Sequence, residues 1–138
     1  MSKNKLKTVI LAIVKNDDDD VLIVRRKNPE HIKGVGDLLW VFPGGALPNS
    51  HEHEEYIIDE TLAETGHYVE VVSKVSERKY PKNAVHLHYY ECSLTTDAST
   101  QLIDDHEIVQ YAWVKPSRLM EDYFEVDMDT KVAKFLGL

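Results

Sequence analysis

The chain has 138 residues and a single cysteine, Cys92, so it is long enough for one self-sufficient domain and has no pair of cysteines for a disulfide. Its formal net charge of -8 argues against DNA or RNA as the main partner, because polymer binding depends on a basic surface that neutralises phosphates. No apolar run approaches the roughly twenty residues needed to span a bilayer, so we expect one cytoplasmic domain over residues 1–138, with no membrane partner and present as a monomer or homodimer.

Two apolar, β-rich runs occupy residues 8–14 and 21–24. They flank Asn16-Asp17-Asp18-Asp19-Asp20, a polar stretch that favours a turn, and together they predict a β-hairpin. The aspartate run lacks the spaced ligands and the glycine of a calcium loop, so a turn is the better interpretation. The lysines before residue 8 superficially resemble the start of a signal peptide, but the apolar run is short and no small-residue cleavage site follows it.

Residues 28–37 contain Pro29, Gly34 and Gly36, which predicts a loop, and residues 38–42 then form a short strand that ends at Pro43-Gly44-Gly45. A helix follows. Either Asn49 together with Glu52, or Ser50 alone, is expected to cap the start of the helix. Gly66 stands where a left-handed residue would end it.

The second half of the chain alternates in the manner of strands at residues 68–75, 85–90 and 108–114. A helical turn is expected at residues 116–117. Asp129 is expected to cap a final helix in which Val132, Phe135 and Leu136 form an apolar stripe. With no repeat and no linker, the pattern predicts a single α/β domain with a mixed sheet between helices.

Glu60 and Glu64 are four residues apart, so they lie on one face of the predicted helix and are close enough to share a divalent cation. Ile58 and Leu62 lie on nearly the opposite face and are expected to bury the helix against the sheet. The acidic face then points at the Gly44-Gly45 turn, where missing side chains would let backbone N–H groups approach an anion. Two carboxylates on a helix are, taken alone, more often a solvated surface.

The wider pattern resembles the Nudix hydrolase family. Gly45, Glu60, Glu64 and Gly66 fall at the spacings of the family signature, and Trp40-Val41-Phe42-Pro43-Gly44 resembles the segment that precedes it. Residues 21–26 and 107–113 are similar to the second and a late strand of the family, so the resemblance covers nearly the whole chain. It implies a Nudix-like α/β/α sandwich and an Mg²⁺-dependent hydrolase, with Mn²⁺ as a second candidate ion.

This sequence also departs from the signature. His51 stands in place of its first glutamate, Asp59 in place of its arginine, and Ala63 in place of one glutamate of its Glu-Glu pair. Thr61 and His67 replace aliphatic residues. The metal ligands and catalytic groups of the family therefore carry over only to Glu60 and Glu64, which predicts a requirement for high Mg²⁺.

The departures leave several interpretations open. Asp59 could partly replace the lost ligand, although adjacent helix positions diverge by about 100°. His51 and Asp59 could form a pair of reversed polarity, and His51 or His53 could ligate a softer metal such as Mn²⁺ or Zn²⁺. Plain exposure of these side chains is the simpler interpretation.

Outside the signature, the resemblance implies that Arg26 contacts substrate phosphate, with Gly44 and Gly45 shaping the turn beside it. It also implies that Glu107 is an additional carboxylate for metal or water. Asp127 and Asp129 correspond to positions where some members read the nucleotide base, although an aspartate there is more commonly a helix cap.

Four further side chains, Tyr80, His86, His88 and Tyr89, could line a base-binding cleft, whereas Val85, Leu87 and Tyr89 could equally form the core face of a strand.

The function that this resemblance implies is hydrolysis of a nucleoside diphosphate linked to another moiety. A nucleoside triphosphate, yielding monophosphate and pyrophosphate, is the first candidate substrate, and nucleotide sugars come next. The alternative is a nucleotide-binding module of the same fold whose catalysis is weak or lost, for which Ala63 and Asp59 are the evidence.

Overall fold

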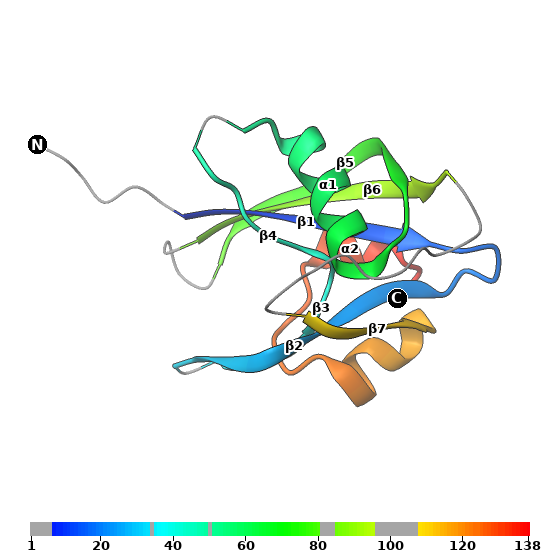
Figure 1. Cartoon of the computed structure of the whole chain (residues 1–138). Helices are drawn as coiled ribbons and strands as arrows, with labels where there is room; N and C mark the ends of the chain where they lie inside the picture. Colours follow the sequence, from blue (N-terminus) through cyan, green and yellow to red (C-terminus); the bar gives the residue numbers. More distant parts are fainter. Residues whose placement is uncertain (1–6, 34, 50, 81–84, 96–107) are drawn as a thin grey trace, which may run out of the picture.

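A computed structural model describes residues 7–33, 35–49, 51–80, 85–95 and 108–138 (Figure 1). The strands in these ranges are β1 (Lys7–Lys15), β2 (Val21–Ile32), β3 (Gly36–Val41), β4 (Gly44–Ala46), β5 (Val69–Lys79), β6 (Val85–Leu94) and β7 (Ile108–Val114). The helices are α1 (His53–Thr65) and α2 (Thr130–Phe135), with a 3₁₀ turn η1 (Pro116–Arg118) and a π turn η2 (Leu119–Tyr123) before α2. No helix formed by these residues is long and apolar enough to cross a membrane.

The strands form a mixed sheet around β1. β1 pairs in parallel with β6 and antiparallel with β4, and β5 extends this part of the sheet by pairing antiparallel with β6. β2 pairs antiparallel with both β3 and β7. The two parts meet where β1 turns into β2, with Lys15 opposite Val21. This layout holds β4, the shortest strand, against the middle of β1.

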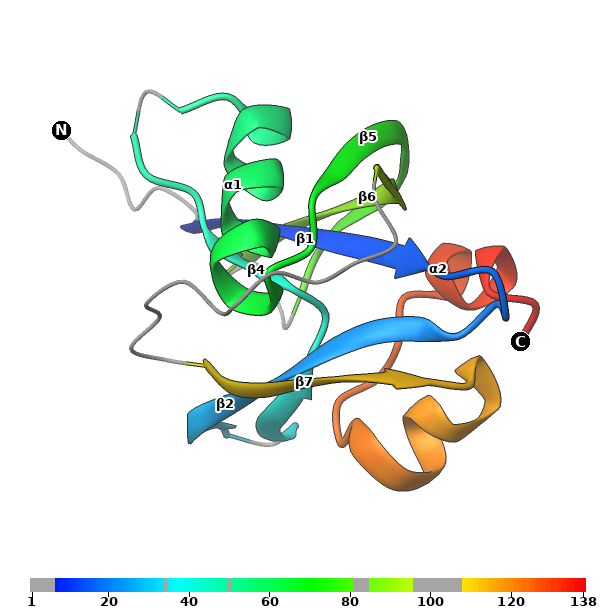
Figure 2. The same ribbon diagram turned by 45° about the vertical axis from the view of Figure 1, so that its right-hand side comes forward.

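Two hydrophobic cores lie on opposite faces of the sheet, because alternate side chains of β1 and β2 point in opposite directions. Ile13 and Ile23 belong to the core that includes Val132 of α2. The other core includes Ala12 and Ile57 of α1. The helices thus cover different faces (Figure 2), which confirms the expected mixed sheet between helices.

Most predicted elements are confirmed. The Asn16 side chain organises the β1–β2 turn, since its Oδ1 accepts hydrogen bonds from the N–H groups of Asp18 and Asp20 at 2.9 and 3.0 Å. β7 has the predicted bounds. Cys92 is buried, and burial raises the pKa of its thiol to about 12.

Several predicted boundaries were wrong. β2 continues to Ile32 through the segment expected to be a loop, with a register shift between Arg25 and Glu30 that accommodates Pro29. Both β5 and β6 run four residues beyond the predicted ends, because each supplies the other's hydrogen bonds. The glycine segment is itself a strand, β4, rather than only a turn.

Helix α1 ends at Gly66 as predicted, with φ 77°. Its start and its buried face differ from expectation. Glu52 is the N-cap residue and its side chain makes no cap bond, so Asn49 does not cap the helix; Ser50 lies outside the described residues.

The fully buried stripe of α1 consists of Ile57, Thr61, Glu64 and Thr65, whereas Ile58 and Leu62 are only half-buried. The helix contacts β1, β4, β5 and β7. Its buried face therefore begins one residue earlier than expected, with Ile57 and Thr61 in place of Ile58 and Leu62. The Thr65 hydroxyl donates to the Thr61 carbonyl at 2.7 Å, which satisfies that polar group inside the core.

Helix α2 forms as predicted. Asp129 caps it, accepting from the N–H groups of Lys131 and Val132 at 2.8 and 3.0 Å. Val132 and Leu136 are buried, and Phe135 packs beside them.

Candidate functional site

Gly44 fits only as glycine. It lies in β4 opposite Leu11 of β1, and its φ is +139°. A Cβ at this position would lie 2.0 Å from the carbonyl oxygen of Ile10, which is part of the sheet backbone and cannot move aside. The missing side chain therefore lets β4 lie directly on β1.

The Glu64 carboxylate connects α1 to β4. Its Oε1 accepts a hydrogen bond from the Gly44 N–H at 2.9 Å, and the residue is only 4% exposed. Of the turn N–H groups that were expected to approach a ligand anion, that of Gly44 instead donates to the helix carboxylate. Glu64 thus holds β4 against α1 and places a carboxylate beside the turn.

One turn earlier, Glu60 faces Gly45. A Cβ on Gly45 would lie 3.9 Å from Glu60 Oε2 and 2.8 Å from the Tyr56 hydroxyl oxygen. The absence of that Cβ leaves room for both side chains beside β4. The structure thus brings Glu60 and Glu64 together with Gly44 and Gly45, at the place where their spacing in the sequence suggested a site.

These carboxylates fit a hard divalent cation. Mg²⁺ is usually bound in proteins by one or two carboxylates while it keeps several waters. Glu60 is half-buried and Glu64 is buried, so Glu60 is the more accessible oxygen donor. Ala63 lies three residues after Glu60, on the same side of the helix, and supplies no oxygen.

A cleft of about 220 Å³ lies beside β4 on the sheet face that carries α2. Its apolar lining includes Trp40, Phe42, Leu87, Tyr89, Phe124 and Met128, and its polar lining includes Lys7, Arg26, Arg78, Tyr80, Asp127 and Asp129. Gly44 and Gly45 line it too. The strand β4 therefore separates the cleft from the carboxylates of α1 by the thickness of one backbone.

Arg26 lines this cleft from β2, and its Nε donates to the carbonyl of Asn28 at 3.2 Å. Arg26 therefore lies in the same cleft as the two glycines, where the sequence suggested a phosphate contact.

Sequence reasoning missed Arg78. Its Nη2 donates to the carbonyl of Asp127 at 2.8 Å, and its guanidinium lies 4.1 Å from the centre of the Tyr80 ring. Its Nε is 3.7 Å from Oδ2 of the buried Asp129. Arg78 and Tyr80 are two residues apart, so strand alternation could have placed them on one face had β5 been expected to reach Lys79.

The two aspartates are placed differently. Asp127 is exposed, and its Oδ2 lies 3.4 Å from the Tyr80 hydroxyl, which donates to it. Asp129 is 6% exposed and caps α2, as described above. Of the two, Asp127 has the carboxylate that a ligand in the cleft can reach.

Not every candidate lies at this site. Tyr80 and Tyr89 line the cleft, but His88 and the other β6 histidine, His86, do not, because strand alternation turns them to the face that carries α1. Glu107 lies outside the described residues.

The suggested pair of His51 and Asp59 is not formed. His51 Nδ1 is 3.1 Å from the carbonyl oxygen of Asn49, and Asp59 is exposed on α1. No ion pair joins the two residues in the described part of the chain.

Comparison with known proteins places the chain among proteins of one family. The family model described as NUDIX domain matches residues 5–135. An ADP-ribose pyrophosphatase from Streptococcus suis 89-1591 superposes with a TM-score of 0.74 at 21% identity, over 96% of this chain and 91% of the other. A search of curated proteins found no match.

Two further structures are similar. The MutT protein from Methanosarcina mazei Go1 gives a TM-score of 0.67 at 15% identity, over 99% of this chain and 94% of the other. A UDP-X diphosphatase gives 0.71 at 17% identity, over 99% of this chain and 64% of the other. At these identities the likeness concerns the fold, and it confirms the architecture expected from the sequence.

Proposed function

Because the chain belongs to the Nudix hydrolase family, whose members act on phosphorus-containing acid anhydrides, we propose that it is a Mg²⁺-dependent pyrophosphohydrolase. Its substrate would be a nucleoside diphosphate linked to another moiety. Hydrolysis breaks one P–O–P bridge: the oxygen of water bonds to one phosphorus, and the bridging oxygen leaves with the other phosphate.

The observation that carries this proposal is the position of β4. The Gly44 N–H donates to the Glu64 carboxylate, and Gly45 lies beside the carboxylate of Glu60. Both glycines also line the cleft. A nucleotide whose base occupies the cleft would therefore extend its phosphates along β4 toward α1.

The chain offers groups for each part of such a substrate. The apolar and aromatic lining suits a base, and Asp127 can accept hydrogen bonds from the base's amino or imino groups. The guanidinium of Arg26 suits the phosphates. Glu60 is the carboxylate that we assign to accept a proton from the attacking water, while Glu64 holds Gly44 and contributes negative charge beside it.

Glu60 and Glu64 are the residues that would hold Mg²⁺, or Mn²⁺ in its place. When bound, this ion would offset negative charge on the phosphates and lower the pKa of a bound water. With Ala63 in place of a third carboxylate, we expect the affinity for Mg²⁺ to be low.

Within this class, a nucleoside triphosphate cleaved to monophosphate and pyrophosphate is the first candidate. Nucleotide sugars are the second. Solved relatives with this fold are described both as MutT and as a UDP-X diphosphatase, which supports testing both groups.

A second candidate is a nucleotide-binding module with little turnover. The observation that favours it is the Glu64 carboxylate, which is buried and bonded to Gly44 while its neighbour Ala63 has no oxygen to offer. Nucleotide binding in the cleft would require neither the Glu64 carboxylate nor an oxygen donor at position 63.

The experiment that separates the two is a substrate panel. Purified protein is incubated with nucleoside triphosphates and nucleotide sugars in Mg²⁺ and, separately, in Mn²⁺, and products are resolved by chromatography. Turnover of at least one nucleotide supports the hydrolase. Measurable nucleotide binding with no turnover at high concentrations of either ion would favour the binding module.

A further inference from the structure

A second group of chemically active side chains lies on the strand pair β5–β6. In this antiparallel ladder Glu77 lies directly opposite His88, and His86 follows two residues away on the same strand as His88. Residues two apart on a strand share a face, and so do directly opposite residues. Strand pairing alone therefore gathers one carboxylate and two imidazoles on one patch of the sheet.

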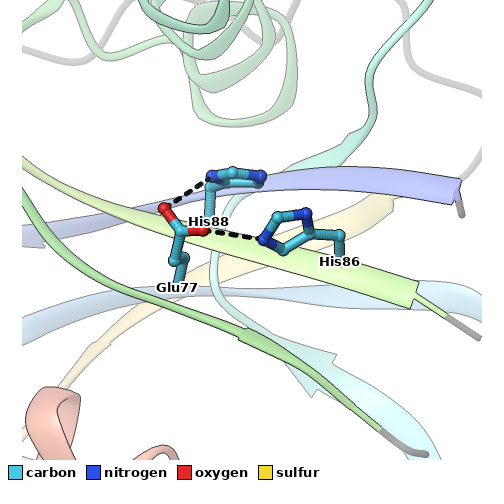
Figure 3. A group of neighbouring side chains, drawn as sticks. All are labelled: Glu77, His86 and His88. Atoms are coloured by element: carbon cyan, nitrogen blue, oxygen red, sulfur yellow. Dashed lines mark hydrogen bonds and ion pairs between the residues drawn. The ribbon is translucent and has the colours of Figure 1, made fainter. Parts of the chain in front are cut away.

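The side chains in this patch point at one another (Figure 3). Glu77 Oε2 is 2.9 Å from His86 Nε2, and Glu77 Oε1 is 3.8 Å from His88 Nδ1. One ligand atom from each residue lies within 4.8 Å of the other two. The two imidazole rings are 4.2 Å apart between centroids. Around one metal ion at bond lengths of about 2.1 Å, such atoms would be roughly 3.4 Å apart, so small side-chain rotations suffice.

We propose that Glu77, His86 and His88 form a binding site for a borderline divalent transition-metal ion of the Zn²⁺ type. Imidazole nitrogen with one carboxylate oxygen is a donor set that Zn²⁺ accepts, whereas Mg²⁺ prefers oxygen ligands alone. The site therefore differs in chemistry from the carboxylates of α1. It also differs in place, because β4 and β6 pair with opposite edges of β1.

His88 gives an independent reason for this assignment. Its Nδ1 is buried and makes no hydrogen bond within the described part of the chain, and its side chain is 9% exposed. A buried polar atom without a partner is costly, and a metal bond would satisfy it.

Two neighbours shape the expected behaviour of the site. The ammonium of Lys74 contacts Glu77 and competes with a metal ion for the carboxylate. The ring of His53, the first residue of α1, is 4.7 Å from that of His88, and its Nδ1 is 2.9 Å from the Tyr90 hydroxyl oxygen. A metal ion here would thus stabilise the contact between β5–β6 and the start of α1.

The test is a calorimetric titration of chelator-treated protein with Zn²⁺, in excess Mg²⁺ so that hard oxygen sites are already occupied. We expect saturable binding of one ion. His88→Asn and Glu77→Gln should each weaken the affinity at least about tenfold. His31→Gln is the matched control, because His31 is an exposed histidine paired at 2.7 Å with one carboxylate, that of Asp37, and should leave the affinity unchanged.

A second variant covers the case in which His88→Asn fails to fold. Lys74→Met removes the competing ammonium from an exposed position and should increase the Zn²⁺ affinity and the rise in melting temperature on adding Zn²⁺. The proposal is overturned if the wild-type protein shows no saturable binding. It is equally overturned if Glu60→Gln abolishes binding while Lys74→Met and Glu77→Gln leave it unchanged, since the ion would then sit at α1.

Discussion

Glu60 and Glu64 occupy equivalent places on successive turns of α1 but meet β4 in different ways. Glu64 is buried and bonded to the Gly44 N–H, whereas Glu60 is half-buried and faces Gly45. The more accessible carboxylate is the better candidate for a group that exchanges protons with water. This difference makes Glu60 the most informative single position for testing the chemistry.

Glu60→Gln keeps the size of the side chain and removes its basicity. We expect it to lower kcat at least about a hundredfold, because a general base typically contributes that much, with the melting temperature little changed. Steady-state assays with the best substrate measure the effect. Glu55→Gln, at an exposed position on the same helix, is the matched control; an equal loss in both variants would show that helix charge in general, and not Glu60, is responsible.

Ala63→Glu adds the oxygen donor that the site lacks. Position 63 lies three residues after Glu60 on the same side of α1. We expect the Mg²⁺ concentration for half-maximal activity to fall about threefold to tenfold, because another carboxylate raises the affinity of the site. Ala63→Gln has similar bulk without the charge, and should not produce this fall. A rise in the Mg²⁺ requirement would contradict the assigned position of the ion.

His67 has a separate effect, on stability. It is buried between Tyr111 and Trp113, and neither ring nitrogen has a hydrogen-bond partner in the described residues. Burial lowers the pKa of His67 below 6.5. Below that pH the unfolded chain binds a proton that the folded chain resists, so the free energy of unfolding falls as the pH decreases from about 6.5 toward the folded-state pKa.

Replacing His67 with leucine removes this proton linkage. We expect His67→Leu to lose less stability than the wild type when the pH is lowered from about 7.5 to about 5.5, measured by urea unfolding at both values. A leucine also suits the apolar surroundings of this site. The same loss in both proteins would show that other groups control the acid sensitivity.

At the scale of elements, β4 is the smallest strand and the one on which the site depends. The sequence predicted a glycine turn but not a strand, because three residues carry too little alternation to be recognised. What makes β4 a strand is the approach of its backbone to Ile10 and Leu11 of β1, a tertiary contact. The continuation of β2 past Arg26 was expected to be a loop for the same reason, because its pairing with β3 is a tertiary contact that local sequence patterns do not show.

Gly44→Ala should disrupt β4 by forcing a Cβ to within 2.0 Å of the Ile10 carbonyl oxygen. We expect a loss of about 2 to 4 kcal/mol in the free energy of unfolding, from overpacking and the positive φ together. Gly137→Ala is the matched control: its φ is +81° but nothing lies within 4 Å of its Cβ, so only about 1 kcal/mol should be lost. Equal losses would show that φ alone matters at Gly44.

At the scale of the whole molecule, the sequence predicted the architecture better than the site. Alternation and turn residues are local, so the mixed sheet, the Asn16 turn and the caps at Gly66 and Asp129 could be predicted directly. The bond from Gly44 to Glu64 joins residues twenty apart and depends on how α1 is rotated about its axis. The placement of Arg78 against Asp127 likewise depends on a long β5.

Two sheet faces with separate chemistry emerge from this arrangement. The face carrying α2 holds the cleft, and the face carrying α1 holds both the glutamates and the histidine patch of β5–β6. In the proposed hydrolase, the cleft binds the nucleotide and the phosphates extend along β4 toward Glu60. Two results therefore test the roles of both faces: which phosphorus–oxygen bond is broken, and whether Glu60 is needed to break it.

The most direct measurement is product analysis by ³¹P NMR after incubation of the protein with a nucleoside triphosphate and excess Mg²⁺. We predict nucleoside monophosphate and pyrophosphate in equal amounts, and at least about a hundredfold slower formation of both with Glu60→Gln. Nucleoside diphosphate and inorganic phosphate as the primary products, or products formed by Glu60→Gln at the wild-type rate, would contradict the proposed function.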